Sequence, residues 1–327
     1  MSVLSKPYFH DEEAAFAHLE AVLWPNGPTC PHCGEMDRIS KIKANPAKRV
    51  RMGLHKCGDC GKQFTVKVGT VSEHARMPLH KMLQAVHLIA CSKKGISSHQ
   101  LHRILEVQYK TAWFLAHRIR EAMRDGSLAP LGGEGKTVEA DETYYGAKDT
   151  VTTRTIRGKP GLSSKRAIVA LVERGGSTRM IHVERADKET VTKIVNENIA
   201  KETRLNTDES PLYNAAKDHV ADHHTVKHTA GEYVRVELDH VNEDESEFHF
   251  RKVHTNTVEG VFSILKRGMH GVYQHCGEKH LHRYLAEFEF RYNNRIAVGV
   301  HDQARAANAL RGMKGKRLTY HGSRAAA

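Results

Sequence analysis

The chain has 327 residues, enough for two or three domains, and its 39% hydrophobic content is low but sufficient for folded cores. A charged fraction of 27% without low-complexity tracts excludes a wholly disordered protein. No apolar run reaches the roughly 18 residues of a transmembrane helix. The first residues carry acids and no apolar core, so they are not a signal peptide. We therefore expect a soluble, intracellular protein.

The net charge of +12 is unevenly distributed along the chain. From Met1 to Arg124 there are 19 Lys and Arg against 10 Asp and Glu, which places +9 in this part. A basic surface of this kind most often binds a polyanion. We expect nucleic acid as the partner, and a solvated basic face without a partner is the alternative.

Patterns along the chain predict helices first and an alternation of strands and helices later. A helix is expected at Phe9–Leu23, a cysteine-rich segment up to about Val68, and mostly helix over Arg76–Asp125. Glycines then indicate a linker up to Gly135. The strands expected beyond it are 137–145, 167–173, 179–183 and 204–208, and the helices are 188–200, 254–269 and 278–295. From about Arg311 the chain reads as a basic, mobile tail.

Four of the six cysteines form two C-x-x-C pairs, Cys30 with Cys33 and Cys57 with Cys60. In a cytosolic chain such pairs indicate metal binding rather than disulfides. Two tight turns of this kind complete a closed, tetrahedral four-thiolate site, which is structural and not catalytic. We predict a zinc ribbon, with His32 in place of one thiolate as the alternative.

Residues 97–124 predict a helix-turn-helix. Ser97 can cap a helix over 99–105, and a turn over 106–110 leads into a second helix over 111–124. The side chains expected to face outward toward phosphates or bases are Trp113, His117, Arg120 and Arg124. A packed helical hairpin with ordinary surface charges is the alternative.

Acidic side chains at strand positions are candidates for binding divalent cations, because Mg²⁺ takes oxygen ligands. Asp141 shares one strand face with Glu139, and an Asp inside a strand is otherwise disfavoured. Glu139 and Glu142 are its rivals. A second candidate is Asp208, at the end of a weak strand.

The predicted helix over 254–269 carries a third acid. Glu259 and Lys266 are seven residues apart, so they project on one side about 10 Å apart along the axis. Asn256 lies one turn before Glu259 on the same face. An ordinary surface helix with one acid and one base is the alternative.

Three further segments carry a specific resemblance: Val-Glu-Ala-Asp-Glu-Thr at 138–143, Val-His-Thr-Asn-Thr-Val-Glu-Gly at 253–260 and Glu-Phe-Glu-Phe-Arg-Tyr-Asn-Asn-Arg at 287–295. Together with the four cysteines, they resemble the bacterial insertion-sequence transposases of the ISXO-like group. These proteins combine an N-terminal zinc ribbon with a DDE catalytic domain of RNase H-like fold. The resemblance runs from about Glu20 to about Gly299.

The resemblance implies a mixed α/β fold in which an RNase H-like domain follows a zinc ribbon and a helix-turn-helix unit. The expected divisions are 1–70 for the N-terminal helix and ribbon, 71–125 for the helix-turn-helix, 136–299 for the DDE domain and 300–327 for a basic tail.

The resemblance also implies a catalytic site. Asp141, Asp208 and Glu259 would bind two Mg²⁺ or Mn²⁺ ions, and Lys266 would contact DNA. Because some relatives carry Asn at the third position, Asn256 is the alternative to Glu259 or shares its role. The intervals of 67 and 51 residues fit the insertion-sequence type better than retroviral integrases.

The implied activity is metal-dependent cleavage at the ends of an insertion sequence, followed by attack of the released 3′-OH on a target strand. Double-stranded DNA and a homodimer or higher oligomer are the implied partners, in the cytoplasm of a bacterium at its nucleoid. A site-specific nuclease of the same fold and a DNA-binding regulator without catalysis are the alternatives.

Overall fold

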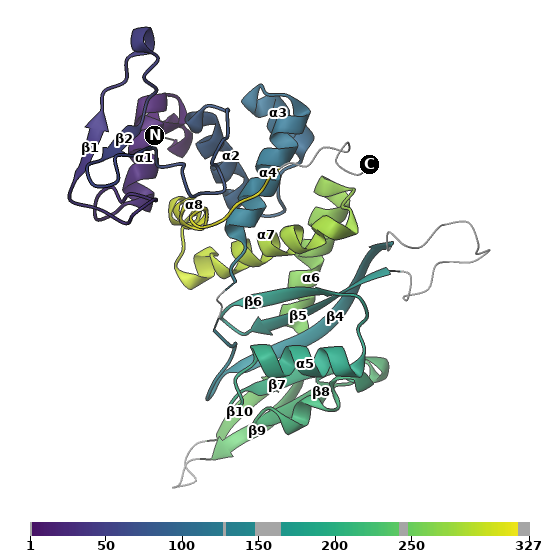
Figure 1. Cartoon of the computed structure of the whole chain (residues 1–327). Coiled ribbons are helices and arrows are strands. Elements are labelled where there is room, and N and C mark those ends of the chain that lie inside the picture. The colour runs from purple at the N-terminus through teal and green to yellow at the C-terminus, as the bar shows by residue number, and fades with distance from the viewer. Residues whose placement is uncertain (1, 127–128, 148–164, 242–247, 320–327) are drawn as a thin grey trace. The chain divides into compact units, whose positions relative to one another are not determined.

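The computed structural model describes residues 2–126, 129–147, 165–241 and 248–319 (Figure 1). Its contacts divide the chain into two units. One unit contains both ends of the chain, residues 1–125 and 294–327, and the other contains residues 126–293. None of the helices within the described ranges is both long and apolar enough to span a bilayer.

The first unit begins with a small ribbon. Its three antiparallel strands are β1 (Ile39–Ile42), β2 (Leu54–Cys57) and β3 (Gln63–Phe64), in the order β1-β2-β3. Phe64 is fully buried beside two cysteines, and the ring of Trp24 meets it edge-on at 5.9 Å. So few apolar side chains cannot hold a ribbon of this size alone, which is why small domains of this kind depend on a metal.

Five helices complete the first unit. They are α1 (Glu12–Leu23), α2 (Leu79–Cys91), α3 (Ser98–Leu105), α4 (Tyr109–Met123) and α8 (Asp302–Arg311). Helix α8 packs against α1, α2 and α4, so the first part of the segment expected as a tail at 300–327 belongs to a folded core. Residues 320–327 of that segment lie outside the described ranges. Sequence patterns could not reveal this, because the partners of α8 lie about two hundred residues away.

Helices α3 and α4 form the predicted helix-turn-helix. The Ser97 hydroxyl accepts a hydrogen bond from the Gln100 amide at 3.1 Å, which caps α3 as its sequence suggests. Glu106 ends α3 in the left-handed conformation, with φ of 51°, and α4 begins three residues later.

The second unit is built on a five-stranded mixed sheet. Its strands are β4 (Thr137–Ala147), β5 (Lys165–Glu173), β6 (Thr178–Val183), β7 (Arg204–Asp208) and β8 (Asp222–Val226), in the order β6-β5-β4-β7-β8. The hairpins β4–β5 and β5–β6 are antiparallel, whereas β7 runs parallel to both β4 and β8. This strand order, with a long first strand at the centre, is the RNase H-like arrangement expected from the sequence.

Helices cover both faces of this sheet. Helix α5 (Lys188–Asn198) packs on the face that Val138 and Ala140 of β4 present, and α6 (Asn256–Gly268) and α7 (Leu281–Asn293) pack on the other face (Figure 1). Because side chains alternate along a strand, Glu139 and Asp141 belong to the face that α6 covers.

A hairpin that the sequence analysis does not predict precedes α6. Its strands are β9 (Arg235–Val241) and β10 (Phe248–Val253). Arg251 joins it to β8 by an ion pair with Asp222 at 2.8 Å, and Arg204 of β7 bonds to Asp239 at 2.9 Å. Ion pairs attach the hairpin to the sheet, while the apolar side chains at alternate positions of its strands, Val236, Leu238, Phe248 and Phe250, are exposed.

The segment 287–295 closes one edge of the sheet. The Asn293 carboxamide accepts from the Thr178 amide at 2.7 Å and donates to the Thr178 carbonyl at 3.0 Å. The Glu289 carboxylate accepts from the Met180 amide at 3.0 Å. Because β6 is an edge strand with unpaired backbone groups, these side chains replace a missing neighbour. This part of the motif therefore has a structural explanation.

Candidate active site and metal centres

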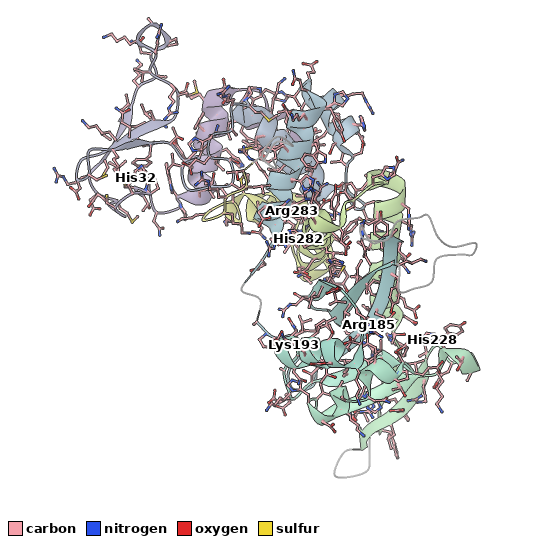
Figure 2. The ribbon with its side chains drawn as sticks, turned by 45° about the vertical axis from the view of Figure 1, so that its right-hand side comes forward. His32, Arg185, Lys193, His228, His282 and Arg283 are labelled. Carbon is pink, nitrogen blue, oxygen red and sulfur yellow. The ribbon has the colours of Figure 1, made fainter. Side chains whose placement is uncertain are left out.

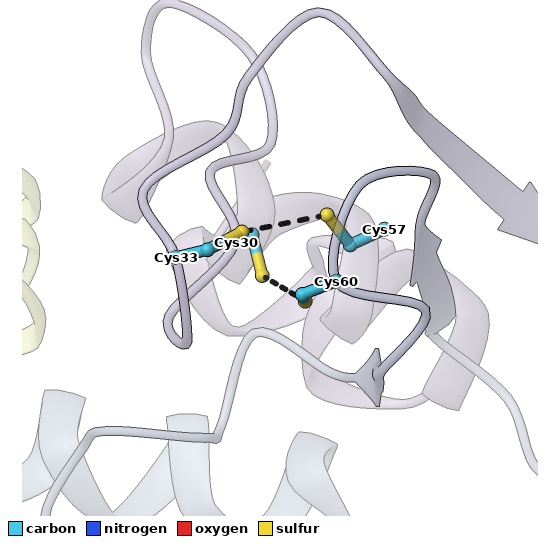
Figure 3. A group of neighbouring side chains, drawn as sticks. All are labelled: Cys30, Cys33, Cys57 and Cys60. Atoms are coloured by element: carbon cyan, nitrogen blue, oxygen red, sulfur yellow. Dashed lines mark hydrogen bonds between the residues drawn. The ribbon is translucent and has the colours of Figure 1, made fainter.

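The four cysteines lie together in the ribbon (Figure 3). Their sulfur atoms are all within 4.8 Å of one another. The Cys30 and Cys60 sulfurs are 3.7 Å apart and those of Cys33 and Cys57 are 3.6 Å apart. Zn–S bonds of 2.3 Å in a tetrahedron require S–S separations of roughly 3.8 Å, so the site fits Zn²⁺. The ribbon thus has a structural metal site.

His32, the alternative ligand, is exposed and does not belong to this cluster (Figure 2). The four thiolates complete a closed site without it, as a structural zinc requires.

Two of the predicted carboxylates come from neighbouring parallel strands. In the β4–β7 ladder, Val138 pairs with Leu205 and Glu139 with Asn206. Continuing this register by two residues brings Asp141 level with Asp208, on adjacent strands roughly 5 Å apart. Asp208 is half-buried at the end of β7, where one carboxylate oxygen accepts the Ser210 amide at 3.0 Å.

The third predicted acid, Glu259, is carried by α6. It lies in the first turn of the helix and its side chain is 46% exposed. The predicted apolar stripe of α6 is buried against the sheet, with Val258, Phe262, Leu265 and Met269 all inaccessible. Asn256 and Lys266 are both exposed on this helix.

The pKa of the Asp141 carboxyl is raised, in part by other carboxylates near it. The pKa of this carboxyl is raised from 3.8 to about 7, mainly by burial and also by the nearby carboxylates of Asp208, Glu142 and Glu259. Negative charge is therefore concentrated around Asp141. A site of this kind favours a bound divalent cation, which would stabilise the ionised form.

The structure separates Asp141 from its rivals. Both oxygens of Glu139, which is fully buried, accept hydrogen bonds from Arg174 and from the first turn of α6. Glu142 points to the opposite face, where it accepts the Tyr213 hydroxyl at 3.0 Å. Burial raises the pKa of Glu142 and nearby Asp208 adds to the shift, while the Tyr213 bond opposes it.

The carboxylates are close but not clustered as tightly as the cysteines. Within the described ranges, only the four cysteines bring three or more candidate ligand atoms within 4.8 Å of one another. The acids therefore do not form a single closed ligand shell. This is compatible with ions that retain water or bind substrate oxygens, as Mg²⁺ does.

His228 is a neighbour of this site that the sequence analysis missed (Figure 2). It lies in the short helix η7 (His228–Ala230), and its Nε2 is 3.1 Å from the Thr255 hydroxyl and 3.6 Å from the Glu259 carboxylate. The Thr255 hydroxyl in turn donates to Glu259 at 3.3 Å. No local pattern identifies His228, because the hairpin separates it from α6 in the sequence.

The prediction of an outward face on α4 is wrong for two residues. His117 and Arg120 are each only 1% exposed, whereas Trp113 is half-buried and Arg124 is exposed. Helix α4 packs against α2, α3 and α8, so more than one of its sides is covered. The helical periodicity assumed a single buried stripe and could not account for α8.

The central carboxylates on a mixed sheet of this order and an acid on the covering helix define an RNase H-like domain, here in a chain that also carries a zinc ribbon. A family model for the ISXO2-like transposase domain matches residues 130–293, about half of the chain, and one for the transposase zinc-ribbon domain matches residues 10–63. The chain belongs to the ISXO2-like transposase family, whose members are DNA-processing enzymes.

Two individual proteins are similar to the chain. An uncharacterized protein in the transposable element ISH50 of Halobacterium salinarum is 27% identical over 296 residues, which cover 86% of this chain and 91% of the relative. The solved structure of a simian T-cell lymphotropic virus intasome in complex with the PP2A regulatory subunit B56 gamma contains a chain that is 16% identical. The match covers 58% of this chain and 63% of the viral one, with a TM-score of 0.27.

Replacing Cys57 by Ser should remove the structural metal, because a serine hydroxyl does not supply the thiolate that zinc requires. We expect loss of stoichiometric zinc, unfolding of the ribbon and loss of DNA binding. Metal analysis, limited proteolysis and a DNA-binding assay check this. Cys91→Ser, a half-buried cysteine of α2 outside the cluster, is the matched control. A Cys57→Ser protein with full zinc content and normal DNA affinity would contradict the assignment.

The raised pKa of Asp141 predicts that Asp141→Asn increases the free energy of unfolding, and that this increase depends on pH. A carboxyl whose pKa is raised from 3.8 to about 7 on folding stabilises the protein below pH 4, and this contribution disappears as the pH rises through 7. Without added divalent cations, Asp141→Asn should become more stable relative to wild type between pH 5 and 8, by about 1–2 kcal/mol after allowance for screening. Denaturant unfolding at both pH values measures this, with exposed Asp218→Asn as control. A difference in the free energy of unfolding between variant and wild type that does not change with pH would refute this prediction.

Proposed function

We propose that this protein is the transposase of an insertion sequence, and that it cleaves DNA at the element's ends and joins the released 3′ ends to a target. The observation that supports this most directly is the convergence of three carboxylates. Continuing the β4–β7 register beyond Glu139 and Asn206 would bring Asp141 level with Asp208, and Glu259 contributes to the raised pKa of Asp141. A DNA-binding regulator has no need of such an arrangement.

The donor set suits hard cations. Asp141, Asp208 and Glu259 offer charged oxygens, and Asn256 offers a neutral amide oxygen one turn before Glu259. When bound, two Mg²⁺ or Mn²⁺ ions supply Lewis-acid stabilisation of the reacting phosphoryl group. The role of the chain's own residues is to hold these ions and to orient the DNA strand between them.

The proposal also assigns DNA contacts to residues outside the metal site. Lys266 lies seven residues beyond Glu259 and is exposed, so its ammonium can bind a phosphate about 10 Å further along α6. On the helix-turn-helix, Trp113 and Arg124 keep their proposed role, whereas the buried His117 and Arg120 do not. The zinc ribbon, residues 1–70, and the helical unit, residues 71–125, bind element ends, while the sheet domain within 136–299 carries out cleavage and joining.

The partners and location follow from the same proposal. Double-stranded DNA is the substrate, both as element end and as target. Two or more copies of the chain act together, because two ends must be joined. Such a protein works in the cytoplasm, at the nucleoid.

Alanine at each of the three carboxylates should abolish activity. Asp141→Ala, Asp208→Ala and Glu259→Ala each remove a charged ligand of a hard cation, so we expect cleavage and joining to fall at least about 10³-fold with DNA binding intact. Labelled end DNA incubated with Mg²⁺ measures both steps. Glu142→Ala, a neighbouring carboxylate on the opposite strand face, is the matched control and should retain activity.

Asn256→Ala distinguishes the two candidates for the third position. An amide oxygen carries no charge, so its loss should cost less than that of Glu259. A dead Asn256→Ala protein alongside a fully active Glu259→Ala protein would move the third ligand one turn back along α6. Normal cleavage by all three carboxylate variants would reject the catalytic proposal in favour of a regulator.

Affinity for DNA should fall steeply with salt. The first 124 residues carry an excess of nine positive charges, and each phosphate that they neutralise releases counterions. If about six phosphates are contacted, affinity should fall about 10³-fold between roughly 50 and 200 mM salt. Fluorescence anisotropy on a duplex probe measures this slope, and Lys266→Ala should reduce it by about one unit. An affinity that does not change over this range would mean that phosphate contacts are not the source of binding.

A further inference from the structure

Helix α6 begins without a cap from its own sequence. Thr255 stands at the N-cap but makes no capping hydrogen bond with its side chain. The amides of Thr257 and Val258 donate instead to one oxygen of Glu139, at 2.7 and 3.1 Å. The Thr257 hydroxyl donates to the other oxygen at 2.8 Å. Since Glu139 belongs to β4, the start of α6 is tied directly to the central strand.

An arginine and a histidine complete the surroundings of this carboxylate. Arg174, which directly follows β5, donates from Nε at 2.6 Å, and Nδ1 of His254 lies 3.1 Å away. Arg174 also donates to the backbone carbonyls of Lys252 and His254, at 2.6 and 2.9 Å. One buried carboxylate therefore joins β4, the end of β5 and the segment that leads from β10 into α6.

This junction lies beside the proposed catalytic acids. Glu139 is two residues before Asp141 on the same strand face, roughly 7 Å away along the strand. Glu259 directly follows Val258, whose amide Glu139 holds. The position of the first turn of α6 against β4 therefore sets the separation between the Asp141 and Glu259 carboxylates.

We propose that Glu139 is a positioning residue that holds Glu259 at the distance from Asp141 at which both bind the same divalent cations. The inference rests on the proposed function, because it takes these two residues as ligands. Glu139 does not itself act as a ligand, since donors from α6 and Arg174 already occupy both of its oxygens. Its contribution is made through the backbone of the helix.

Glu139→Gln in the full-length chain tests this role. The glutamine side chain has the same size but no charge. Its NH₂ group replaces one of the two oxygens that accept hydrogen bonds from α6 and Arg174. We expect Mn²⁺ binding, measured by isothermal titration calorimetry, to weaken at least about 10-fold, as for other residues that orient metal ligands. The Mn²⁺ concentration for half-maximal cleavage should rise in parallel, and excess Mn²⁺ should restore much of the rate. DNA affinity should not change.

A second, milder variant keeps the proposal testable if Glu139→Gln does not fold. Thr257→Val removes only the hydroxyl donor and keeps the shape and the backbone amide, so it should fold and weaken Mn²⁺ binding in the same direction by a smaller factor. If Glu139→Gln does not fold, Thr257→Val decides alone, and wild-type Mn²⁺ affinity in that variant would overturn the proposal.

The chain offers a matched control in the same unit. Glu287 is as fully buried as Glu139 and pairs with Arg291 within α7. Glu287→Gln should lower the melting temperature comparably but leave Mn²⁺ affinity at the wild-type value. Equal weakening of Mn²⁺ binding by both substitutions would reduce Glu139 to a general contributor to stability and overturn the proposal.

Asp141→Ala separates this inference from the proposed function. Loss of Mn²⁺ binding in Asp141→Ala with normal binding in Glu139→Gln would overturn the positioning role alone. Normal Mn²⁺ binding and cleavage in both variants would overturn the proposed function, and the positioning role with it.

Discussion

The unit built on the mixed sheet depends on how a helix without a local cap, α6, is attached to a strand, β4. The first turn of α6 leaves backbone amides that need acceptors, and Thr255 supplies none from its side chain. Glu139 meets this need from β4, and its negative charge also suits the positive end of the helix dipole. Losing one partner of a buried charged pair such as Glu139–Arg174 typically costs about 3–5 kcal/mol. The same solution occurs at α2, where the Glu12 carboxylate accepts from the amide of Leu79 at 2.8 Å.

The acids that this attachment brings together oppose the stability of the fold. Burial and neighbouring carboxylates raise the pKa of Asp141, so the domain without cations carries an unfavourable concentration of negative charge. Proteins tolerate such an arrangement where it serves function, and the cost disappears when a cation binds. The rest of the sheet compensates with a continuous apolar interior on both faces.

Arg291 balances a second buried acidic charge, that of Glu287. Arg291 lies within α7 beside Glu287 and above the Phe288 ring, at 4.5 Å from its centroid. Burial alone would lower the pKa of this guanidinium, but Glu287 and Tyr273 raise it above its usual value. The segment 287–295, which supports the resemblance most specifically, therefore contributes to packing and to protection of the sheet edge. A motif can identify a family through its fold rather than through its reactive groups.

The sequence alone determined the features that arise from local patterns. Two C-x-x-C pairs specified the ribbon, short runs bounded by turn residues located β4 to β7, and the stripe beginning at Val258 located α6. Ser97 marked the start of α3 correctly. Asp141 could be proposed because an Asp inside a strand is disfavoured, whereas Asp208 and Glu259 depended on the resemblance.

Only the tertiary structure decided which distant residues meet. The parallel register of β4 and β7 pairs Glu139 with Asn206, and Glu139 became a cap rather than a rival because α6 returns to its strand face. Helix α8 buries a second side of α4. These outcomes depend on contacts between segments far apart in the chain. Their free energy comes from strand pairing, charge pairing and burial that no short window of sequence contains.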